Sequence, residues 1–209
     1  MCCRYYMEES EELEPIIEEA NRSPLKERFE SGLGRPLVTA GEVRPTNLVP
    51  VIAPNRSGAK TVFPMVWGFT LPRSASPLIN ARVESAGTKP TFRESWVRRR
   101  CIIPASYYFE WEHQMDAATG KARTGEKYRI QPRGAGVTWL AGLYRMEELR
   151  GIQVPVFTVL TREPGENIRF IHDRMPVILP GEDVEKWIHP DSKPEEIIQD
   201  ALTDMAFWK

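Results

Sequence analysis

Residues 101–111 form a strand-like run, Cys101-Ile102-Ile103-Pro104-Ala105-Ser106-Tyr107-Tyr108-Phe109-Glu110-Trp111. Short runs of β-branched and aromatic side chains, interrupted by proline or glycine, are typical of strands. The pattern recurs on both sides in five more runs, Leu48–Ala53, Thr61–Phe69, Lys127–Ile130, Val137–Tyr144 and Ile152–Thr161. We therefore expect a series of strands between about residues 38 and 161.

Proline is spread through these runs, and the chain contains 18 prolines. Because proline cannot donate to a sheet ladder, this distribution favours bulged, edge-rich antiparallel sheets with long connections. Strands and helices do not alternate regularly, which argues against a doubly wound parallel sheet. The sequence therefore predicts an α+β fold: antiparallel, partly barrel-like sheets with peripheral helices, in a single compact domain over residues 1–209.

Helical spacing is confined to the two ends of the chain. Residues 13–20 carry apolar side chains at the i, i+3, i+4, i+7 spacing of an amphipathic helix. Residues 182–188 and 194–202 are helix candidates, and residues 167–171 are expected to form a short turn. The charged, glycine-containing segment 114–126 is expected to be a surface loop or a long hairpin.

Length and composition exclude several classes of protein. With 209 residues, 41% of them hydrophobic, the chain is able to build one sizeable core. No apolar run approaches the ~20 residues of a membrane span, and no secretory leader opens the sequence, so we expect a soluble intracellular protein. The three cysteines include two neighbours, Cys2 and Cys3, which favours free thiols. Neither zinc-ligand spacing nor a nucleotide-cofactor motif is present, so no metal and no cofactor is expected.

Charge is unevenly distributed. Residues 8–30 carry nine acidic and three basic side chains, and residues 181–209 carry eight and three, so the middle of the chain is basic. Six basic side chains lie between Arg82 and Arg100, against two glutamates. Such a segment is able to follow a phosphate backbone, although solvated faces without a partner fit equally well. Unpaired bases stack on aromatic rings, and the candidates, more than half of which we expect in the core, are Trp67, Phe69, Trp96 and Tyr107.

Cys2 gives the chain an unusual chemical possibility. Loss of Met1 would leave an α-amine with a pKa of about 7.7–8.0 beside a thiol with a pKa near ~8.5. Such a 1,2-aminothiol attacks an aldehyde through the amine to form an imine, and the thiol then closes a thiazolidine ring. The alternative is that Cys2 and Cys3 open a strand as small apolar residues.

Three further polar positions are candidates for chemistry. Strand alternation would put Asn80, Arg82 and Glu84 on one face, beside an anionic ligand or facing solvent. Glu110 lies between aromatic residues, which would raise its pKa and suit a general acid or base, unless it pairs structurally with an arginine. His172 is suited to moving protons near neutral pH, unless it is a hydrogen-bonded structural residue.

Six short motifs occur in a definite order over residues 1–176. They are Met1-Cys2-x-Arg4-Tyr5, Trp67-Gly68-Phe69, Asn80-Ala81-Arg82-x-Glu84, Arg100-Cys101-x-x-Pro104, Phe109-Glu110-Trp111 and His172-x-Arg174-Met175-Pro176. With this set of motifs the chain resembles the SOS-response-associated peptidase family, the abasic-site-processing proteins.

The resemblance implies a sensor of abasic sites that acts in the DNA damage response. After loss of Met1, Cys2 would attack the ring-opened aldehyde of the abasic site and form a thiazolidine DNA–protein crosslink. Asn80 would hold the N-terminal residue or the opened sugar, while Glu110 and His172 would handle protons. The family name also implies a peptidase activity that removes Met1, with Cys2 and Glu110 as participants. A general methionine aminopeptidase is the alternative.

The resemblance also implies a partner, single-stranded DNA that contains abasic sites. The positions expected to contact it are Arg4, Trp67, Arg82, Lys89 and Arg174. A monomer without a membrane partner is expected, located in the cytoplasm if the source is bacterial and associated with the nucleoid when bound to DNA.

Two positions depart from the family pattern, since Cys3 and Tyr107 stand where glycine is usual. Cys3 would add a competing thiol, and Tyr107 would narrow the cleft. Two other functions remain open from the residues alone. One is a thiol peptidase that cleaves other proteins with Cys2 and His172. The other is a module that binds single strands without covalent chemistry.

Overall fold

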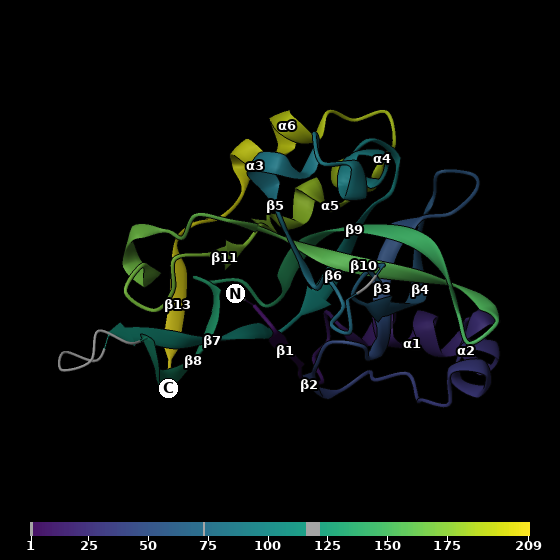
Figure 1. The fold of residues 1–209 in the computed structure, drawn as a ribbon, viewed down its shortest axis with the longest axis horizontal. Helices are drawn as coiled ribbons and strands as arrows, with labels where there is room; N and C mark the ends of the chain where they lie inside the picture. Colours follow the sequence, from purple (N-terminus) through teal and green to yellow (C-terminus); the bar gives the residue numbers. More distant parts are fainter. Residues whose placement is uncertain (1, 73, 116–121) are drawn as a thin grey trace.

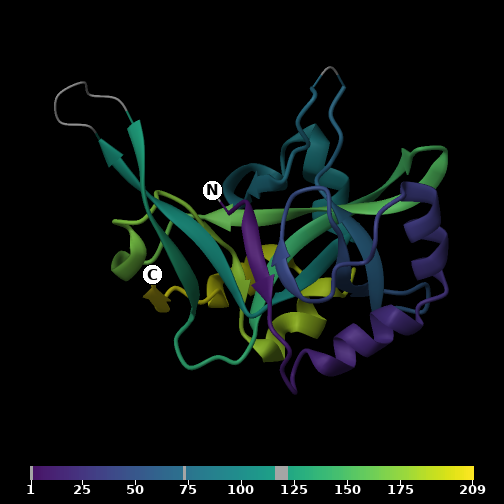
Figure 2. The same cartoon turned by 90° about the horizontal axis from the view of Figure 1, so that it is seen from below.

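Two sheets form the framework of the protein (Figure 1). The computed structural model describes residues 2–72, 74–115 and 122–209. In these residues the first sheet has five strands in the order β13-β8-β7-β1-β2, with every pair antiparallel. Their bounds are β1 Arg4–Met7, β2 Gly41–Val43, β7 Tyr107–Met115, β8 Ala122–Pro132 and β13 Met205–Trp208. Strands β7 and β8 extend beyond their neighbours as a two-stranded ribbon (Figure 2).

The second sheet, of eight strands within the described residues, closes on itself. Strand β9 pairs with β6 along one edge and with β10 along the other, which completes the ring β10-β4-β3-β6-β9. Only β4 and β5 run parallel to β10 among the described pairings. The bounds are β3 Leu48–Pro54, β4 Lys60–Trp67, β5 Asn80–Arg82, β6 Arg100–Ala105, β9 Thr138–Leu149, β10 Ile152–Arg162, β11 Met175–Pro176 and β12 Ile178–Leu179.

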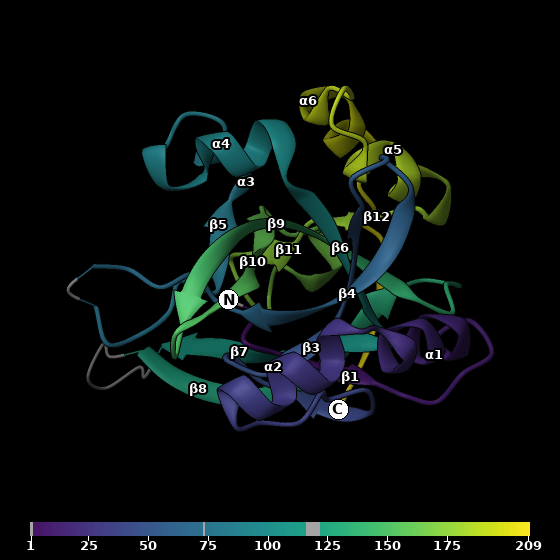
Figure 3. The ribbon, with the colours of Figure 1, turned by 90° about the vertical axis from the view of Figure 1, so that its right-hand side faces the viewer.

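Helices lie around the closed sheet in two groups (Figure 3). The first group, α1 Glu14–Arg22 and α2 Leu25–Leu33, packs on β3 and β4. The second group lies on the other side and comprises α3 Val83–Ala86, α4 Pro90–Arg98, α5 Val184–Ile188 and α6 Pro194–Ile197. Short 3-10 turns are found at Glu166–Ile168, Gly181–Asp183 and Ile198–Asp200. None of the helices in the described part of the chain is long and apolar enough to cross a membrane.

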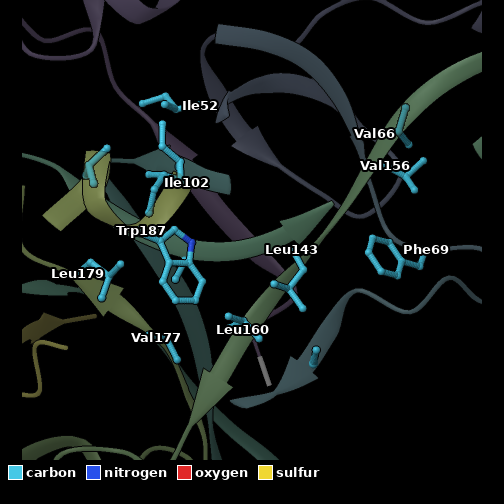
Figure 4. Close-up of a cluster of buried hydrophobic side chains, with 14 of the residues drawn as sticks. Ile52, Val66, Phe69, Ile102, Leu143, Val156, Leu160, Val177, Leu179 and Trp187 are labelled. Carbon is cyan, nitrogen blue, oxygen red and sulfur yellow. The ribbon is translucent and has the colours of Figure 1, made fainter. Parts of the chain in front are cut away.

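Alternate side chains of the closed sheet enter two separate hydrophobic clusters. On β3, Leu48 and Ile52 join the cluster that packs against the helices, where Figure 4 shows Trp187 of α5 beside Ile102. Val49 and Val51 belong to the second cluster, which includes residues of the five-stranded sheet and the side chain of Cys2. The period-2 pattern of a strand therefore explains why both faces of the closed sheet are apolar.

The α+β prediction is confirmed, including the antiparallel, partly barrel-like sheets and the peripheral helices. The expectation that helices occur only near the two ends is wrong, because α3 and α4 lie in the middle of the chain. One predicted strand differs in detail, because the run 101–111 breaks at Ser106 into β6 and β7, which lie in different sheets. The predicted hairpin over residues 114–126 is present where β7 and β8 pair, while residues 116–121 lie outside the described part.

The expectation that Asn80, Arg82 and Glu84 share one strand face is wrong. Strand β5 ends at Arg82, and Glu84 lies in α3. The chain turns there into a helix, so the period-2 alternation does not continue to Glu84.

Arg100 also differs from its predicted place in a basic track, because its side chain is only 1% exposed. Its Nε donates to the carbonyl of Trp187 (2.7 Å), and its Nη1 donates to those of Trp96 (2.7 Å) and Val97 (2.8 Å). Its Nη2 donates to the carbonyl of His189 and to the carbonyl and Oγ of Ser192. The guanidinium thus satisfies backbone acceptors at the ends of α4 and α5 and ties both helices to β6.

We predict that Arg100→Met lowers the free energy of unfolding by about 3–5 kcal/mol, because several buried carbonyls lose their donor. The matched control is Arg99→Met, which removes an ion pair with Glu94 at a partly exposed side chain and is expected to cost less than about 1 kcal/mol. Urea unfolding followed by circular dichroism measures both. Equal losses for the two variants would contradict the structural role of Arg100.

Candidate active site

Cys2 lies just before β1, packed among residues of both sheets, and its side chain has no exposed surface. Its Sγ donates a weak hydrogen bond to the carbonyl of Arg4 (3.7 Å). Burial raises the pKa of the Cys2 thiol well above its usual value, and the charge of Glu110 acts in the same direction. The thiol is therefore protonated at neutral pH in this structure.

Asn80 holds the main chain at Cys2. Its Nδ2 donates to the carbonyl oxygen of Cys2 (2.8 Å), while its Oδ1 is buried without a hydrogen-bond partner among the described residues. The asparagine reaches this position because β5 pairs in parallel with β10, with Asn80 opposite Val159. A residue in the closed sheet thus fixes the first residues of the other sheet.

Glu110 and His172 face each other beside this contact. Glu110 of β7 is 3% exposed and His172, just before β11, is 5% exposed. The distance from Glu110 Oε1 to His172 Nε2 is 4.0 Å. Burial raises the pKa of the Glu110 carboxyl and lowers the pKa of the His172 imidazole to about 4. Both groups are shifted toward their uncharged forms, as proton transfer in a buried site requires.

Neighbouring backbone sets the tautomer of His172. The main-chain N–H of Arg174 donates to Nδ1 (3.0 Å), which places the proton of a neutral imidazole on Nε2, toward Glu110. The carboxylate of Asp173 also lies 2.7 Å from Nδ1, but its side chain is 76% exposed. We assign the amide as the partner, because the backbone fixes it whereas an exposed carboxylate rotates freely.

Sequence reasoning missed three residues near this site. Tyr5 and Tyr108 pair across β1 and β7, and both hydroxyls are buried without a hydrogen-bond partner among the described residues. Burial raises the pKa of each phenol, and a thiolate at Cys2 would act in the same direction, which places both phenols near the cysteine. His113 is the third, with its ring centroid 3.9 Å from that of His172. Nothing in the sequence around these three residues indicates that they lie near Cys2 and His172.

The predicted DNA contacts separate into exposed and buried residues. Arg82 and Lys89 are exposed where α3 and α4 begin. Arg4 is half-buried, bonded to Glu42 (3.1 Å) and 5.3 Å from the centre of the Trp111 ring. Arg4 and Arg82 lie two residues after Cys2 and Asn80, respectively, in the sequence, and all three cations have solvent-accessible surface.

The other two predicted contacts, Trp67 and Arg174, lie in the interior. Trp67 has no exposed surface, stacks on Phe157 and donates to the carbonyl of Ile79 (3.0 Å), so a base cannot reach it in this structure. Arg174 is 8% exposed, and its Nη1 and Nη2 both donate to the Glu84 carboxylate (2.8 Å each). Arg174 therefore holds Glu84 with its side chain and His172 with its amide.

Other expected aromatic contacts are also buried, including Phe69, Trp96 and Tyr107. Tyr107 stacks on Tyr6 (5.2 Å, 7°) and pairs with it across β7 and β1. Strand alternation puts Tyr107 on the face of the sheet opposite to Tyr108 and Glu110, so it does not narrow the space beside Cys2. Cys3 is half-buried with a free thiol next to Cys2.

The arrangement brings together four groups from four separate segments: a thiol, an amide, a carboxyl and an imidazole. A family model described as SOS response associated peptidase (SRAP) matches residues 1–207. The chain belongs to the SOS response-associated peptidase family.

Curated relatives of this family member carry a common description. The abasic site processing protein YoaM of Bacillus subtilis is 34% identical over 142 residues, which are 65% of this chain and 60% of that protein. The abasic site processing protein YedK of Escherichia coli is 28% identical over 134 residues, 64% of this chain and 57% of that protein. The chain thus spans about 60% of the length of the curated relatives it matches.

Solved structures show the same fold. A protein from Bacteroides thetaiotaomicron superposes with a TM-score of 0.71 at 23% identity, covering 99% of this chain and 91% of that one. A phage-related protein from Bordetella bronchiseptica gives 0.67 at 20% identity, covering 99% and 93%.

Burial of His172 predicts how the stability of this SOS response-associated peptidase family member depends on pH. The pKa of His172 is about 4 in the folded chain against a usual 6.5. Between these values the unfolded chain binds the extra proton, so acidification through this window removes up to about 3 kcal/mol of stability. We expect His172→Gln to lose less stability than the parent between pH 7 and pH 5 in urea unfolding. His189→Gln, at an exposed histidine, is expected to follow the parent; if His172→Gln does so too, burial does not hold the imidazole neutral.

Proposed function

We propose that this protein senses abasic sites in single-stranded DNA and crosslinks to them through Cys2 after Met1 is removed. The observation that carries the proposal is the meeting of Cys2 with Asn80, Glu110 and His172 in one buried cluster. The relatives' description as abasic site processing proteins supports the same substrate.

In the first step the Cys2 amine attacks C1′ of the ring-opened abasic sugar, whose aldehyde oxygen takes a proton. The resulting carbinolamine loses its hydroxyl as water and becomes an imine. Asn80 holds the Cys2 carbonyl at 2.8 Å, so the amine is restrained before it reacts. Glu110, whose pKa burial raises, retains the proton that the leaving hydroxyl needs.

In the second step the Cys2 thiol adds to the imine carbon, and its proton passes to the nitrogen, which closes the thiazolidine ring. The thiol has a raised pKa, so a base must take its proton as the C–S bond forms. Neutral His172 is proposed to relay it: Nδ1 takes up a proton while Nε2 passes its own to the Glu110 carboxylate left by the first step, 4.0 Å away. The sum of both steps is aldehyde plus aminothiol giving thiazolidine plus one water.

The strand itself is proposed to lie against the exposed Arg82 and Lys89 and the half-buried Arg4, which make contacts to phosphate without reading bases. Removal of Met1 is proposed as self-processing by Cys2 and Glu110, with a general aminopeptidase as the alternative. Monomeric action inside the cell belongs to the same proposal.

A thiol peptidase that cleaves other proteins is less well supported. Catalytic cysteines have a lowered pKa and an adjacent histidine that is able to accept a proton. Here burial raises the pKa of Cys2 and lowers that of His172, so the thiolate–imidazolium pair is not formed at rest. We therefore do not propose it as the second function.

Intact mass spectrometry of the untagged protein tests the crosslink. With an oligonucleotide that carries one abasic site we expect loss of Met1 and an adduct equal to protein plus DNA minus one water. Cys2→Ala is expected to abolish the stable adduct while leaving an imine that borohydride traps. Cys3→Ala is the matched control, because it removes the neighbouring thiol only, and it is expected to crosslink normally.

If the adduct is lost with Cys3→Ala and retained with Cys2→Ala, the crosslink forms through Cys3, which contradicts the proposal. Binding of intact and abasic strands with equal affinity and no covalent product would favour the non-covalent binding module. The intact masses distinguish the first outcome, and the binding curves for intact and abasic strands distinguish the second.

Glu110 is predicted to shape the pH dependence of crosslinking. The reaction needs an uncharged amine and a protonated Glu110, whose pKa burial raises, and these two opposite requirements give a bell-shaped dependence of the rate on pH. We expect Glu110→Gln to slow the reaction by about 10²–10⁴-fold and to remove the falling limb. Single-turnover rates from pH 5 to 9 measure this; an unchanged profile shape in Glu110→Gln would remove the carboxyl from the proton transfers.

A further inference from the structure

His113, His172 and Asp173 form a group that the sequence analysis did not anticipate, since no metal-ligand spacing is visible there. One candidate ligand atom from each residue lies within 4.8 Å of the other two. The centroids of the two imidazole rings are 3.9 Å apart, and the ring planes are tilted by 53°. Two imidazoles and one carboxylate are the donor set that suits zinc and similar divalent transition metals.

We propose that His113, His172 and Asp173 form a binding site for a divalent transition-metal ion such as Zn²⁺, and that metal binding withdraws His172 from the crosslinking reaction. The metal-binding part stands on its own geometry. The inhibitory part rests on the proposed function.

The fold keeps His113 near this group. The main-chain N–H of His113 donates to the carbonyl of Ile171 (3.0 Å), which joins β7 to the segment before His172. The pairing of β7 with β8 shifts register between Trp111 and His113. That irregularity changes the strand alternation, and so places the His113 ring against His172.

Only small movements convert the group into a tetrahedral site. Zinc–nitrogen bonds of about 2.0–2.1 Å put neighbouring ligand atoms about 3.4 Å apart. His172 Nδ1 and Asp173 Oδ1 are already 2.7 Å apart. His113 and Asp173 are exposed, so both side chains are able to rotate toward the buried imidazole, and water completes the coordination.

Metal binding would change the hydrogen bonding of His172 directly. A metal ion at Nδ1 takes the lone pair that now accepts the N–H of Arg174. The imidazole is then unable to turn or to exchange its proton freely with Glu110, 4.0 Å away. A zinc-bound His172 is thus a poor base, which connects the metal site to the rate of ring closure.

Metal binding is tested first without DNA, on untagged protein, by competition with a chromogenic zinc chelator. We expect one Zn²⁺ per chain, with at least tenfold weaker binding in His113→Ala and in Asp173→Asn. His189→Ala, at an exposed histidine outside the group, is expected to bind as the parent does. Absence of binding, or equal binding by His113→Ala, overturns the site.

Cobalt absorption then identifies the ligands, because Cys2 and Cys3 are nearby thiols. Nitrogen and oxygen ligands give visible d–d bands without a thiolate-to-cobalt charge-transfer band in the near ultraviolet. A charge-transfer band that disappears in Cys3→Ala would place the metal on the thiols and overturn the proposal.

Inhibition is measured last, as the ratio of crosslinking rates with zinc and with EDTA in the same variant. We expect zinc to slow the parent at least tenfold and to leave His113→Ala within twofold of its own EDTA rate. Zinc bound at the group without any slowing overturns the inhibitory part alone. If the parent does not crosslink even in EDTA, the proposed function fails while the chelator and cobalt results still decide the metal site.

Discussion

Closure of the larger sheet by β9 is the constraint on which the position of the site depends. Gly142 of β9 lies opposite Cys101 of β6 and Val159 of β10. A Cβ at residue 142 would lie 2.6 Å from Ile103 Cδ1 and 2.9 Å from the carbonyl oxygen of Thr158, so only glycine allows both neighbours this close. The closed ring fixes β10, and β10 in turn holds β5 with Asn80.

Burial then gives the site its electrostatic character. The same loss of water raises the pKa of Glu110 and lowers that of His172, so an acid and a base face each other largely without charge. A charged pair at this depth would be costly to keep. Their 4.0 Å contact therefore joins two groups that burial shifts toward their uncharged forms.

The sequence predicted the class of fold, while the packing around the four proposed site residues could not be read from it. Alternating apolar runs are local signals, so β3, β4 and β10 were visible, and the family motifs marked Cys2, Asn80, Glu110 and His172. The break at Ser106, which separates β6 from β7, depends on bonds to Tyr6 and Thr138 that are distant in sequence. The burial of Trp67 and Arg100 and the approach of His113 to His172 likewise come from tertiary packing.

The polar atoms gathered around Cys2 have a consequence for the evolution of the chain. Among the described residues, Asn80 Oδ1, Tyr5 OH and Tyr108 OH are buried without hydrogen-bond partners, and each such group costs about 1–3 kcal/mol. Selection for folding alone would exchange them for apolar side chains of similar size. Under the crosslinking function proposed above, their presence makes the interior beside Cys2 the region where gains in thermal robustness and retention of that function are in conflict.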